Sequence, residues 1–302
     1  IGGPAVWSYP SAGTARIDLA HEHWLVCPSH VLWRHNRELC TGRECFRCQL
    51  SFKRPPQMWR STSLLARHGR DVDAFVAMSE FSRAKHREFD FPFDMRVLPY
   101  FLPDPPTAQR PRVVDRPQPR PYFFFVGRLE RIKGLDEVIP LFREYRDADL
   151  VIAGAGEHAE HLKQLASGLD NVKFLGRVPS DELARYYKGC EALIVPSICF
   201  ETFGIILIEA FSNGVPVIAR RLGPFPEIVE SSGGGELFTT QAELLAAMRR
   251  IQSDPGHREK LAENGWNALR DRWSESVVVP RYLELVERVI AARRAKLAQG
   301  AR

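Results

Sequence analysis

From residue 122 onward, short continuous apolar runs alternate with stretches whose apolar residues recur at helical spacing. The continuous runs predict buried strands, and the stretches between them predict amphipathic helices. The predicted strands cover residues 122–127, 149–153, 171–175, 192–196 and 215–219, and the predicted helices cover 135–145, 157–167, 180–188, 203–211, 241–253 and 257–272. Strands without polar alternation that are separated by helices indicate a parallel sheet covered on both faces. We therefore predict an α/β fold with a doubly wound sheet whose ligand lies at the carboxyl ends of the strands.

Proline content separates this part of the chain from the part before it. Residues 103–121 contain repeated prolines, which remove backbone donors and exclude both regular helix and central strand. We interpret this segment as an interdomain linker between a first domain over residues 1–102 and a second domain over 122–275. Residues 276–302 predict one further helix with a basic end.

The composition is that of an ordinary globular protein, with 44% apolar and 26% charged residues among 302. The net charge of +5 comes from residues 1–118, because the remainder of the chain is balanced. A basic surface of this kind either contacts anionic lipid or glycan at a membrane periphery or is simply solvated. No basic motif interleaved with aromatic residues argues for nucleic acid. No apolar run approaches the ~20 residues of a membrane span and no signal-peptide pattern is present, so we expect a cytoplasmic protein.

Four of the six cysteines lie close together in the chain: Cys27, Cys40, Cys45 and Cys48. The Cys45-x2-Cys48 spacing is typical of a hairpin that binds zinc, and the other two cysteines could complete the site. Disulfides are disfavoured in a cytosolic protein. A structural zinc site and a group of reduced, packed cysteines are therefore the two interpretations.

The stretch from residue 197 to residue 210 carries the most specific chemistry. Glu201 and Gly204 precede an apolar helix, and Glu209 lies about a turn and a half inside it. A helix N-terminus presents unpaired N–H groups and a positive dipole end to a phosphate, and a glycine lets the phosphate approach closely. Carboxylates accept hydrogen bonds from sugar hydroxyls. This combination predicts a nucleotide-sugar site.

Glu201-x7-Glu209 and the residues that follow it resemble the donor-site signature of retaining glycosyltransferases of family 4, the glycosyl transferases group 1. The block over 125–134, Phe-Val-Gly-Arg-Leu-Glu-Arg-Ile-Lys-Gly, is similar to the segment with which that family clamps the donor diphosphate. Three further blocks occur in the family's order, at 152–157, 174–178 and 226–229. The resemblance extends from about residue 70 to residue 290 and implies the GT-B fold, which has two Rossmann-like domains. It also implies that the last helix, over 276–302, crosses back toward the first domain.

The resemblance also implies a role for each residue of the donor site. Arg128 and Lys133 would neutralise the donor diphosphate, in a family that needs no metal for catalysis. Glu201 would contact the transferred sugar, and Glu209 would bind the ribose hydroxyls. The remaining contacts would come from Phe203 and Gly204, which present backbone to the phosphate, from Gly127 in the clamping segment, and from Gly156, Arg177 and Val178 around the base.

A histidine of the first domain would reach the reaction centre. His21 opens the sequence His-Glu-His-Trp, which is similar to a family block that begins His-Asp-Tyr-Trp. His21 is our candidate, and His23 beside it is the alternative. Tyr100 stands where the family commonly has asparagine.

By this resemblance the chain is a retaining glycosyltransferase of the hexosyltransferase type, which moves a sugar from a nucleotide-sugar to a glycan, lipid or small-molecule acceptor. Polysaccharide biosynthesis is the expected setting, and no cofactor besides the donor is implied. Residues 1–102 are too few for a complete first domain, so we expect roughly the first 80–100 residues of a family member to be missing. The alternative is therefore a non-catalytic nucleotide-sugar binder or an inactive remnant. A sugar-nucleotide epimerase of the same fold is a third candidate, which the form of Glu201-x7-Glu209 disfavours.

Overall fold

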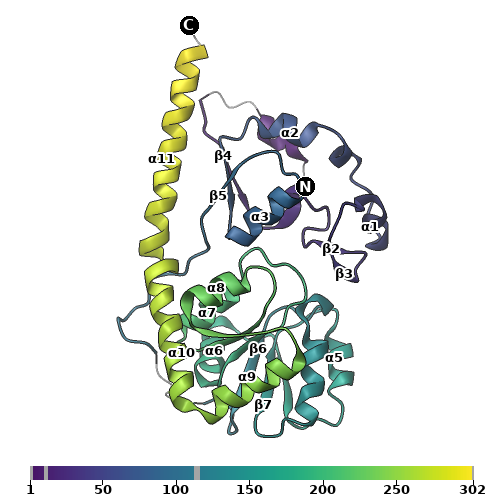
Figure 1. Ribbon diagram of the computed structural model, residues 1–302, viewed down its shortest axis with the longest axis vertical. Helices are drawn as coiled ribbons and strands as arrows, with labels where there is room; N and C mark the ends of the chain where they lie inside the picture. Colours follow the sequence, from purple (N-terminus) through teal and green to yellow (C-terminus); the bar gives the residue numbers. More distant parts are fainter. Residues whose placement is uncertain (1–2, 10–12, 112–115, 301–302) are drawn as a thin grey trace. The chain divides into compact units, whose positions relative to one another are not determined.

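The computed structural model describes residues 3–9, 13–111 and 116–300, and the chain divides into two compact units (Figure 1). Unit 1 comprises Ile1–Tyr100, Phe200–Phe203 and Ser276–Arg302, and unit 2 comprises Phe101–Cys199 and Gly204–Glu275. The chain therefore leaves unit 2 for four residues and returns to it at Gly204. The proline-rich segment that we interpreted as a linker falls in unit 2, and its residues 112–115 lie outside the described ranges.

Unit 2 contains a six-stranded sheet in the order β11-β10-β9-β6-β7-β8, in which every neighbouring pair is parallel. The strands are β6 (Tyr122–Val126), β7 (Asp149–Ala153), β8 (Val172–Gly176), β9 (Leu193–Val195), β10 (Val217–Arg220) and β11 (Gly235–Phe238). From β6 and β9 the order runs outward in opposite directions, which is the doubly wound topology that the sequence predicts. The expected α/β fold is confirmed.

Helices and turns connect these strands. They are η4 (Arg131–Lys133), α4 (Leu135–Val138), η5 (Ile139–Arg143), α5 (Ala159–Leu165), α6 (Ser180–Gly189), α7 (Ile205–Ser212), α8 (Phe225–Ser232), α9 (Gln241–Ser253), α10 (Pro255–Ala268) and the π-helix η6 (Leu269–Trp273). The prediction of one α-helix over 135–145 is wrong, because Pro140 lacks the N–H group that would continue α4, and a 3-10 turn follows instead. The prediction that a helix starts at residue 203 is also wrong, since Gly204 takes a left-handed conformation and α7 begins after it.

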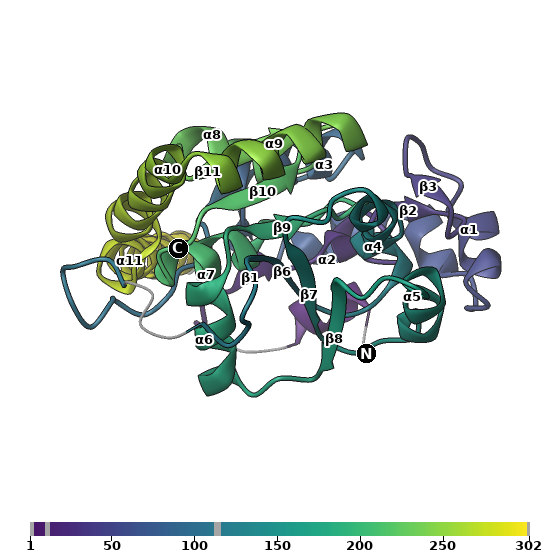
Figure 2. The same ribbon diagram turned by 90° about the horizontal axis from the view of Figure 1, so that it is seen from below.

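The central strand β6 explains why helices cover both faces of the sheet. Residues 122–125 of this strand are at most 4% exposed. Phe123 and Phe125 join a buried core with residues of η5, α5 and α9 on one face. Phe124 faces the opposite side, where its ring lies 5.3 Å from that of Tyr187 on α6. Alternate residues of a strand point to opposite faces, so a run of aromatic residues fits a strand buried on both sides. Figure 2 shows α6 and α7 on one side of this sheet and α5 on the other.

Unit 1 has a smaller parallel sheet in the order β1-β4-β5. Its elements are η1 (Pro4–Ser8), β1 (Ile17–Ala20), η2 (His23–Leu25), the pair β2 (Trp33–Arg34) and β3 (Glu38–Leu39), α1 (Cys45–Ser51), η3 (Met58–Ser61), α2 (Leu64–Gly69), β4 (Ala74–Ala77), α3 (Glu80–Glu88), β5 (Met95–Val97) and α11 (Glu275–Gly300). The core gathers around Phe75, whose ring lies 4.9 Å from Phe91 and 5.4 Å from Trp7. Helix α11 belongs to this unit apart from its first residue, and Arg293 on it lies 3.4 Å from Asp73.

None of the helices within the described ranges combines the length and the apolar character that crossing a bilayer requires.

Candidate functional site

The carboxyl edge of the unit 2 sheet is where the strand order diverges, at the neighbouring strands β6 and β9. The loops after these two strands meet there, because the amide of Ile198 donates a hydrogen bond to the carbonyl of Ile132 over 2.9 Å. Gly134 permits this approach. Its φ is +76°, and a Cβ at this position would lie 2.1 Å from the carbonyl oxygen of Pro196. A side chain at residue 134 would therefore force the two loops apart.

The loop after β7 is attached to the loop after β6 in a similar way. The amide of His158 donates to the carbonyl of Leu129 over 3.0 Å. A Cβ on Gly156 would lie 2.2 Å from that same carbonyl oxygen, and a Cβ on Gly154 would lie 1.9 Å from the carbonyl oxygen of Gly127. Close backbone packing is thus one reason for glycine at residue 156, in addition to the ligand contact that the resemblance implied.

The two cations predicted to bind phosphate stand on the loop after β6. The side chain of Arg128 is 74% exposed and pairs with Glu130 at 2.8 Å. Lys133 is half-buried and ends η4. An exposed ion pair stabilises a protein by at most about 1 kcal/mol, so Arg128 can exchange Glu130 for a phosphate at little cost. Both cations therefore border the point at which the sheet diverges.

Helix α7 begins at this same edge. Gly204 precedes it with φ +99°, and a Cβ there would lie 2.7 Å from the ring of Phe225. Both the backbone conformation and the available space therefore require glycine. The amide of Leu207 donates to the carbonyl of Gly204 over 3.0 Å, so the N–H groups of Ile205 and Ile206 come before the first bond of the helix, beside the positive end of its dipole. This is the arrangement with which a helix N-terminus binds an anion.

Glu209 lies inside α7 and is half-buried on the wall of a cavity of about 440 Å³. The cavity lies between α6, α7 and residues 102–107. The hydroxyl of Tyr187 on α6 donates a hydrogen bond to Oε2 of Glu209 over 3.2 Å. Burial raises the pKa of Glu209, and the bond from Tyr187 offsets part of that effect. Glu209 is therefore part of a cavity wall and not of a solvated helix face.

Arg177 and Val178, predicted for the base pocket, follow β8 at the same edge. The carbonyl of Gly176 accepts a hydrogen bond from the amide of Gly154 over 2.7 Å, which joins the loops after β8 and β7. Arg177 is exposed and Val178 is half-buried. The loops after β6, β7, β8 and β9 thus form one continuous rim, which we call the carboxyl rim.

The sequence interpretation missed Arg220, at the end of β10. Its Nε donates to the carbonyl of Pro196 over 3.0 Å, and its Nη2 pairs with Glu137 on α4 at 2.6 Å. The guanidinium lies over the ring of Phe238 at 5.0 Å, and the side chain is 14% exposed. Arg220 therefore connects the loop after β9 with α4. The one signal in the sequence is a basic residue that ends an otherwise apolar strand.

In unit 1, Tyr100 brings the predicted residues His21 and Phe203 close together. The ring of Tyr100 stacks on that of His21 at 5.4 Å and meets that of Phe203 edge-on at 5.7 Å. The hydroxyl of Thr202 donates to the carbonyl of His21 over 2.9 Å. Glu201 is half-buried in this same segment. The signature residues 201–203 are therefore held against His21 within unit 1.

The two histidines of the His-Glu-His-Trp sequence differ in burial. His21 is exposed, and its Nδ1 shares a hydrogen bond with the hydroxyl of Tyr100. His23 is 0% exposed, and this burial, together with the nearby His86, lowers its pKa to about 3. A neutral, buried His23 is a core residue. Of the two, His21 has the access that contact with a substrate requires.

A cavity of about 10 Å³ in unit 1 is lined by all four predicted zinc ligands, Cys27, Cys40, Cys45 and Cys48. All four are free thiols, and burial raises the pKa of three of them. The Sγ of Cys27 lies 3.2 Å from the hydroxyl of Ser29, and the Sγ of Cys48 accepts a hydrogen bond from the amide of His35 over 3.4 Å. A cavity of this size has room for one atom-sized occupant. The zinc site stays a prediction.

The family model described as glycosyl transferases group 1 matches residues 108–267. The chain belongs to this family. The matched residues lie in unit 2, apart from Phe200–Phe203, and they include the carboxyl rim. The resemblance that we drew from Glu201-x7-Glu209 is confirmed.

This chain matches part of the length of two relatives that are named as glycosyltransferases. An uncharacterized glycosyltransferase of Methanocaldococcus jannaschii is 34% identical over 158 residues, which make up 50% of this chain and 40% of that protein. The lipopolysaccharide core biosynthesis glycosyltransferase LpsD of Rhizobium meliloti is 30% identical over 234 residues, which make up 74% of this chain and 66% of that protein. The chain therefore spans less than two thirds of the length of either relative.

Solved structures share the fold. HepE of Anabaena, in its complex with UDP, is similar with a TM-score of 0.65 at 17% identity, over 92% of this chain and 72% of that one. At this identity the likeness concerns the fold alone. The expected GT-B fold is confirmed.

Proposed function

We propose that this member of the glycosyl transferases group 1 family is a retaining glycosyltransferase of family 4, and that unit 2 binds the nucleoside diphosphate of its sugar donor. The observation that carries the proposal is the carboxyl rim. Arg128 and Lys133 follow β6, the start of α7 follows β9, and the bond from the amide of Ile198 to the carbonyl of Ile132 joins these two loops, while Glu209 lies inside α7. Family membership supports it independently.

The charges of this edge complement a diphosphate. Arg128 and Lys133 supply two cations, and the N–H groups that follow Gly204 supply hydrogen-bond donors. When the bond between sugar and phosphate breaks, the leaving diphosphate gains negative charge. Groups that are already fixed around it then stabilise the transition state more than the bound donor. We assign to these residues the work that a metal ion would otherwise do.

We propose that Glu209 accepts hydrogen bonds from the ribose hydroxyls and that the base lies against Gly156, Arg177 and Val178. The half-buried position of Glu209 on α7, the helix that begins at the carboxyl rim, supports the first assignment, because burial strengthens hydrogen bonds to a charged acceptor. The second assignment rests on the position of the three residues after β7 and β8 on the carboxyl rim.

We assign contact with the transferred sugar to Glu201 and His21. The anomeric configuration is retained in the proposed reaction, because the acceptor hydroxyl attacks from the side that the diphosphate leaves. The leaving phosphate oxygen accepts the proton of that hydroxyl, so no protein nucleophile is assigned. We propose a glycan or glycolipid acceptor in the cytoplasm, where the basic excess of residues 1–118 would favour an anionic membrane surface.

Calorimetric titration with UDP, GDP and ADP tests the proposed donor site. One of the three should bind in the micromolar range, and Arg128→Ala or Glu209→Gln should weaken it roughly tenfold to a hundredfold, since each removes a charge-assisted hydrogen bond. Arg146→Ala is the matched control, because this half-exposed arginine pairs with Asp170 away from the carboxyl rim. Equal affinity in all variants would overturn the site. Transfer with inversion, seen by NMR of the product, would overturn the retaining reaction.

A further inference from the structure

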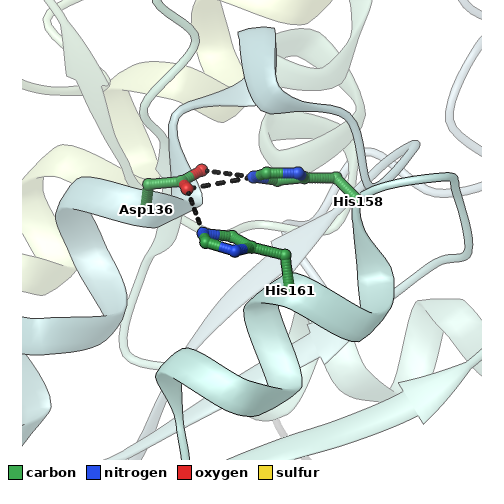
Figure 3. A group of neighbouring side chains, drawn as sticks. All are labelled: Asp136, His158 and His161. Carbon is green, nitrogen blue, oxygen red and sulfur yellow. Dashed lines mark hydrogen bonds and ion pairs between the residues drawn. The ribbon is translucent and has the colours of Figure 1, made fainter.

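Three side chains from two neighbouring segments of unit 2 converge on one point (Figure 3). Asp136 lies on α4, His158 directly precedes α5, and His161 lies in its first turn. Nε2 of His158 lies 2.9 Å from both carboxylate oxygens of Asp136, and Nε2 of His161 lies 3.0 Å from one of them. Among the residues that the structure describes, this is the group of three whose potential metal-binding atoms all lie within 4.8 Å of one another.

We propose that Asp136, His158 and His161 bind a divalent transition metal ion, with Zn²⁺ as the reference ion. Two imidazole nitrogens and one carboxylate oxygen are a ligand set that favours zinc, nickel, copper or cobalt over magnesium or calcium. Zinc–ligand bonds of about 2.0–2.1 Å in a tetrahedron place neighbouring ligand atoms roughly 3.3 Å apart. The observed distances of 2.9 and 3.0 Å therefore need to open by only a few tenths of an ångström.

The arrangement of the two rings also suits one shared ion. The imidazole rings stack with centroids 4.5 Å apart, and both direct Nε2 at the same carboxylate. Each Nε2 can donate an electron pair to one metal ion at that point. The side chains are 19%, 33% and 55% exposed for His158, Asp136 and His161, so water can reach the remaining coordination positions.

The position of this group links it to the carboxyl rim. Asp136 follows Lys133 by three residues, with the left-handed Gly134 between them. His158 follows Gly156 by two residues, and its amide bonds to Leu129. An ion held by both segments would cross-link the loops after β6 and β7. This consequence rests on the proposed function, since tighter loops would then raise the affinity for the nucleotide.

Titration of the metal-free protein with Zn²⁺ in the absence of nucleotide tests the site by itself. One Zn²⁺ should bind through the histidines, and His161→Gln or Asp136→Asn should weaken that event at least tenfold. His257→Gln is the matched control, because this histidine pairs with Glu236 elsewhere in unit 2. Thermal melting without metal should be alike in all variants, which separates loss of binding from loss of fold.

Repeating the titration with Co²⁺ identifies the ligands. Cobalt bound to thiolates gives an intense sulfur-to-metal charge-transfer absorption, whereas nitrogen and oxygen ligands do not. A cobalt site without that absorption, lost in His161→Gln, supports the proposal. A protein that binds no Zn²⁺ below millimolar concentration, or binds it equally in both site variants, overturns the proposal. Nucleotide titration with and without Zn²⁺ then tests the cross-link. If Zn²⁺ leaves the nucleotide affinity unchanged, the cross-link is refuted while the metal site still stands.

Discussion

The hydroxyl of Tyr187 donates a hydrogen bond to Glu209 over 3.2 Å, and this joins α6 to α7 at the wall of the cavity of about 440 Å³. The bond keeps a half-buried carboxylate in place without neutralising it. Burial raises the pKa of Glu209 above its ordinary value, so holding this group ionised costs the folded protein free energy.

Glu209→Gln should therefore stabilise the protein at neutral pH while it weakens nucleotide binding. The folded state binds the proton of Glu209 more tightly than the unfolded state does. The protonated group therefore contributes stability below its unfolded pKa, and this contribution is lost as the pH rises through the folded pKa. Urea unfolding at pH 7 should show a gain of roughly 0.5–2 kcal/mol, which shrinks toward pH 4. An unchanged free energy of unfolding at pH 7 would contradict this account.

Gly134→Ala should separate the loops after β6 and β9. The left-handed backbone costs an alanine about 1–2 kcal/mol, and the contact with the carbonyl of Pro196 adds an overpacking cost of about 1–3 kcal/mol. Gly168→Ala is a close control, because its φ of +78° nearly equals +76° at Gly134 while a Cβ there meets nothing within 4 Å. Denaturant unfolding and nucleotide titration measure both. Equal losses in the two variants would show that the loop contact contributes nothing.

Arg220→Met should loosen the same rim from the side of β10. It leaves the carbonyl of Pro196 and the carboxylate of Glu137 without their guanidinium partner, which costs about 1–3 kcal/mol. The neighbouring Arg221 is half-exposed and pairs with Glu230, so Arg221→Met should change stability by no more than about 0.5 kcal/mol. Nucleotide affinity should fall in the first variant alone. An equal change of nucleotide affinity in the Arg220→Met and Arg221→Met variants would refute a positioning role for Arg220.

His21→Ala should lower the rate of sugar transfer and leave nucleotide affinity unchanged. The reason is that His21 lies in unit 1, where it contacts Tyr100, whereas Arg128, Lys133 and Glu209 lie in unit 2. Transfer assays and calorimetry on the same preparation separate the two effects. If the unmodified chain binds a nucleotide but never transfers sugar, the non-catalytic binder that the sequence left open becomes the better description.

Cys45→Ser tests the predicted zinc site of unit 1. Mass spectrometry under native conditions should detect one zinc in the unmodified protein that is lost in the variant, together with a lower melting temperature. Cys190→Ser provides the comparison, because this buried thiol bonds to the carbonyl of Tyr187 in unit 2. If the cysteines of unit 1 react at once with a thiol reagent and no zinc is found, they are packed, reduced residues.

The sheet of unit 2 could be predicted because each strand is buried on both faces and therefore reads as an uninterrupted apolar run. The run of aromatic residues at 122–125 is the most direct case. Helix ends were harder to place, since Gly204 and Pro140 act through backbone conformation and a missing donor. Both residues are visible in the sequence, and each of them marks the bound of a helix.

The contacts that shape the carboxyl rim could not be predicted from the sequence. Arg220 and Glu137 are separated by 83 residues along the chain, and Tyr187 and Glu209 by 22. Such pairs are fixed by strand order and helix packing, and no local pattern encodes them. The assignment of residues 200–203 to unit 1 is a further example. The signature is continuous in the sequence, although its residues belong to two units.

Three glycines, at residues 134, 154 and 156, leave no space for a side chain where the loops of unit 2 touch. Hydrogen bonds between main-chain groups thus join these loops, in addition to the contacts of Arg220. Ala155, Glu157 and Arg177 on the same rim are exposed. Exchanges at these three positions would alter the surface that the proposed site offers to a base without separating the loops. Under the proposed function, nucleotide preference can therefore change while the main-chain contacts beside the proposed diphosphate site stay the same.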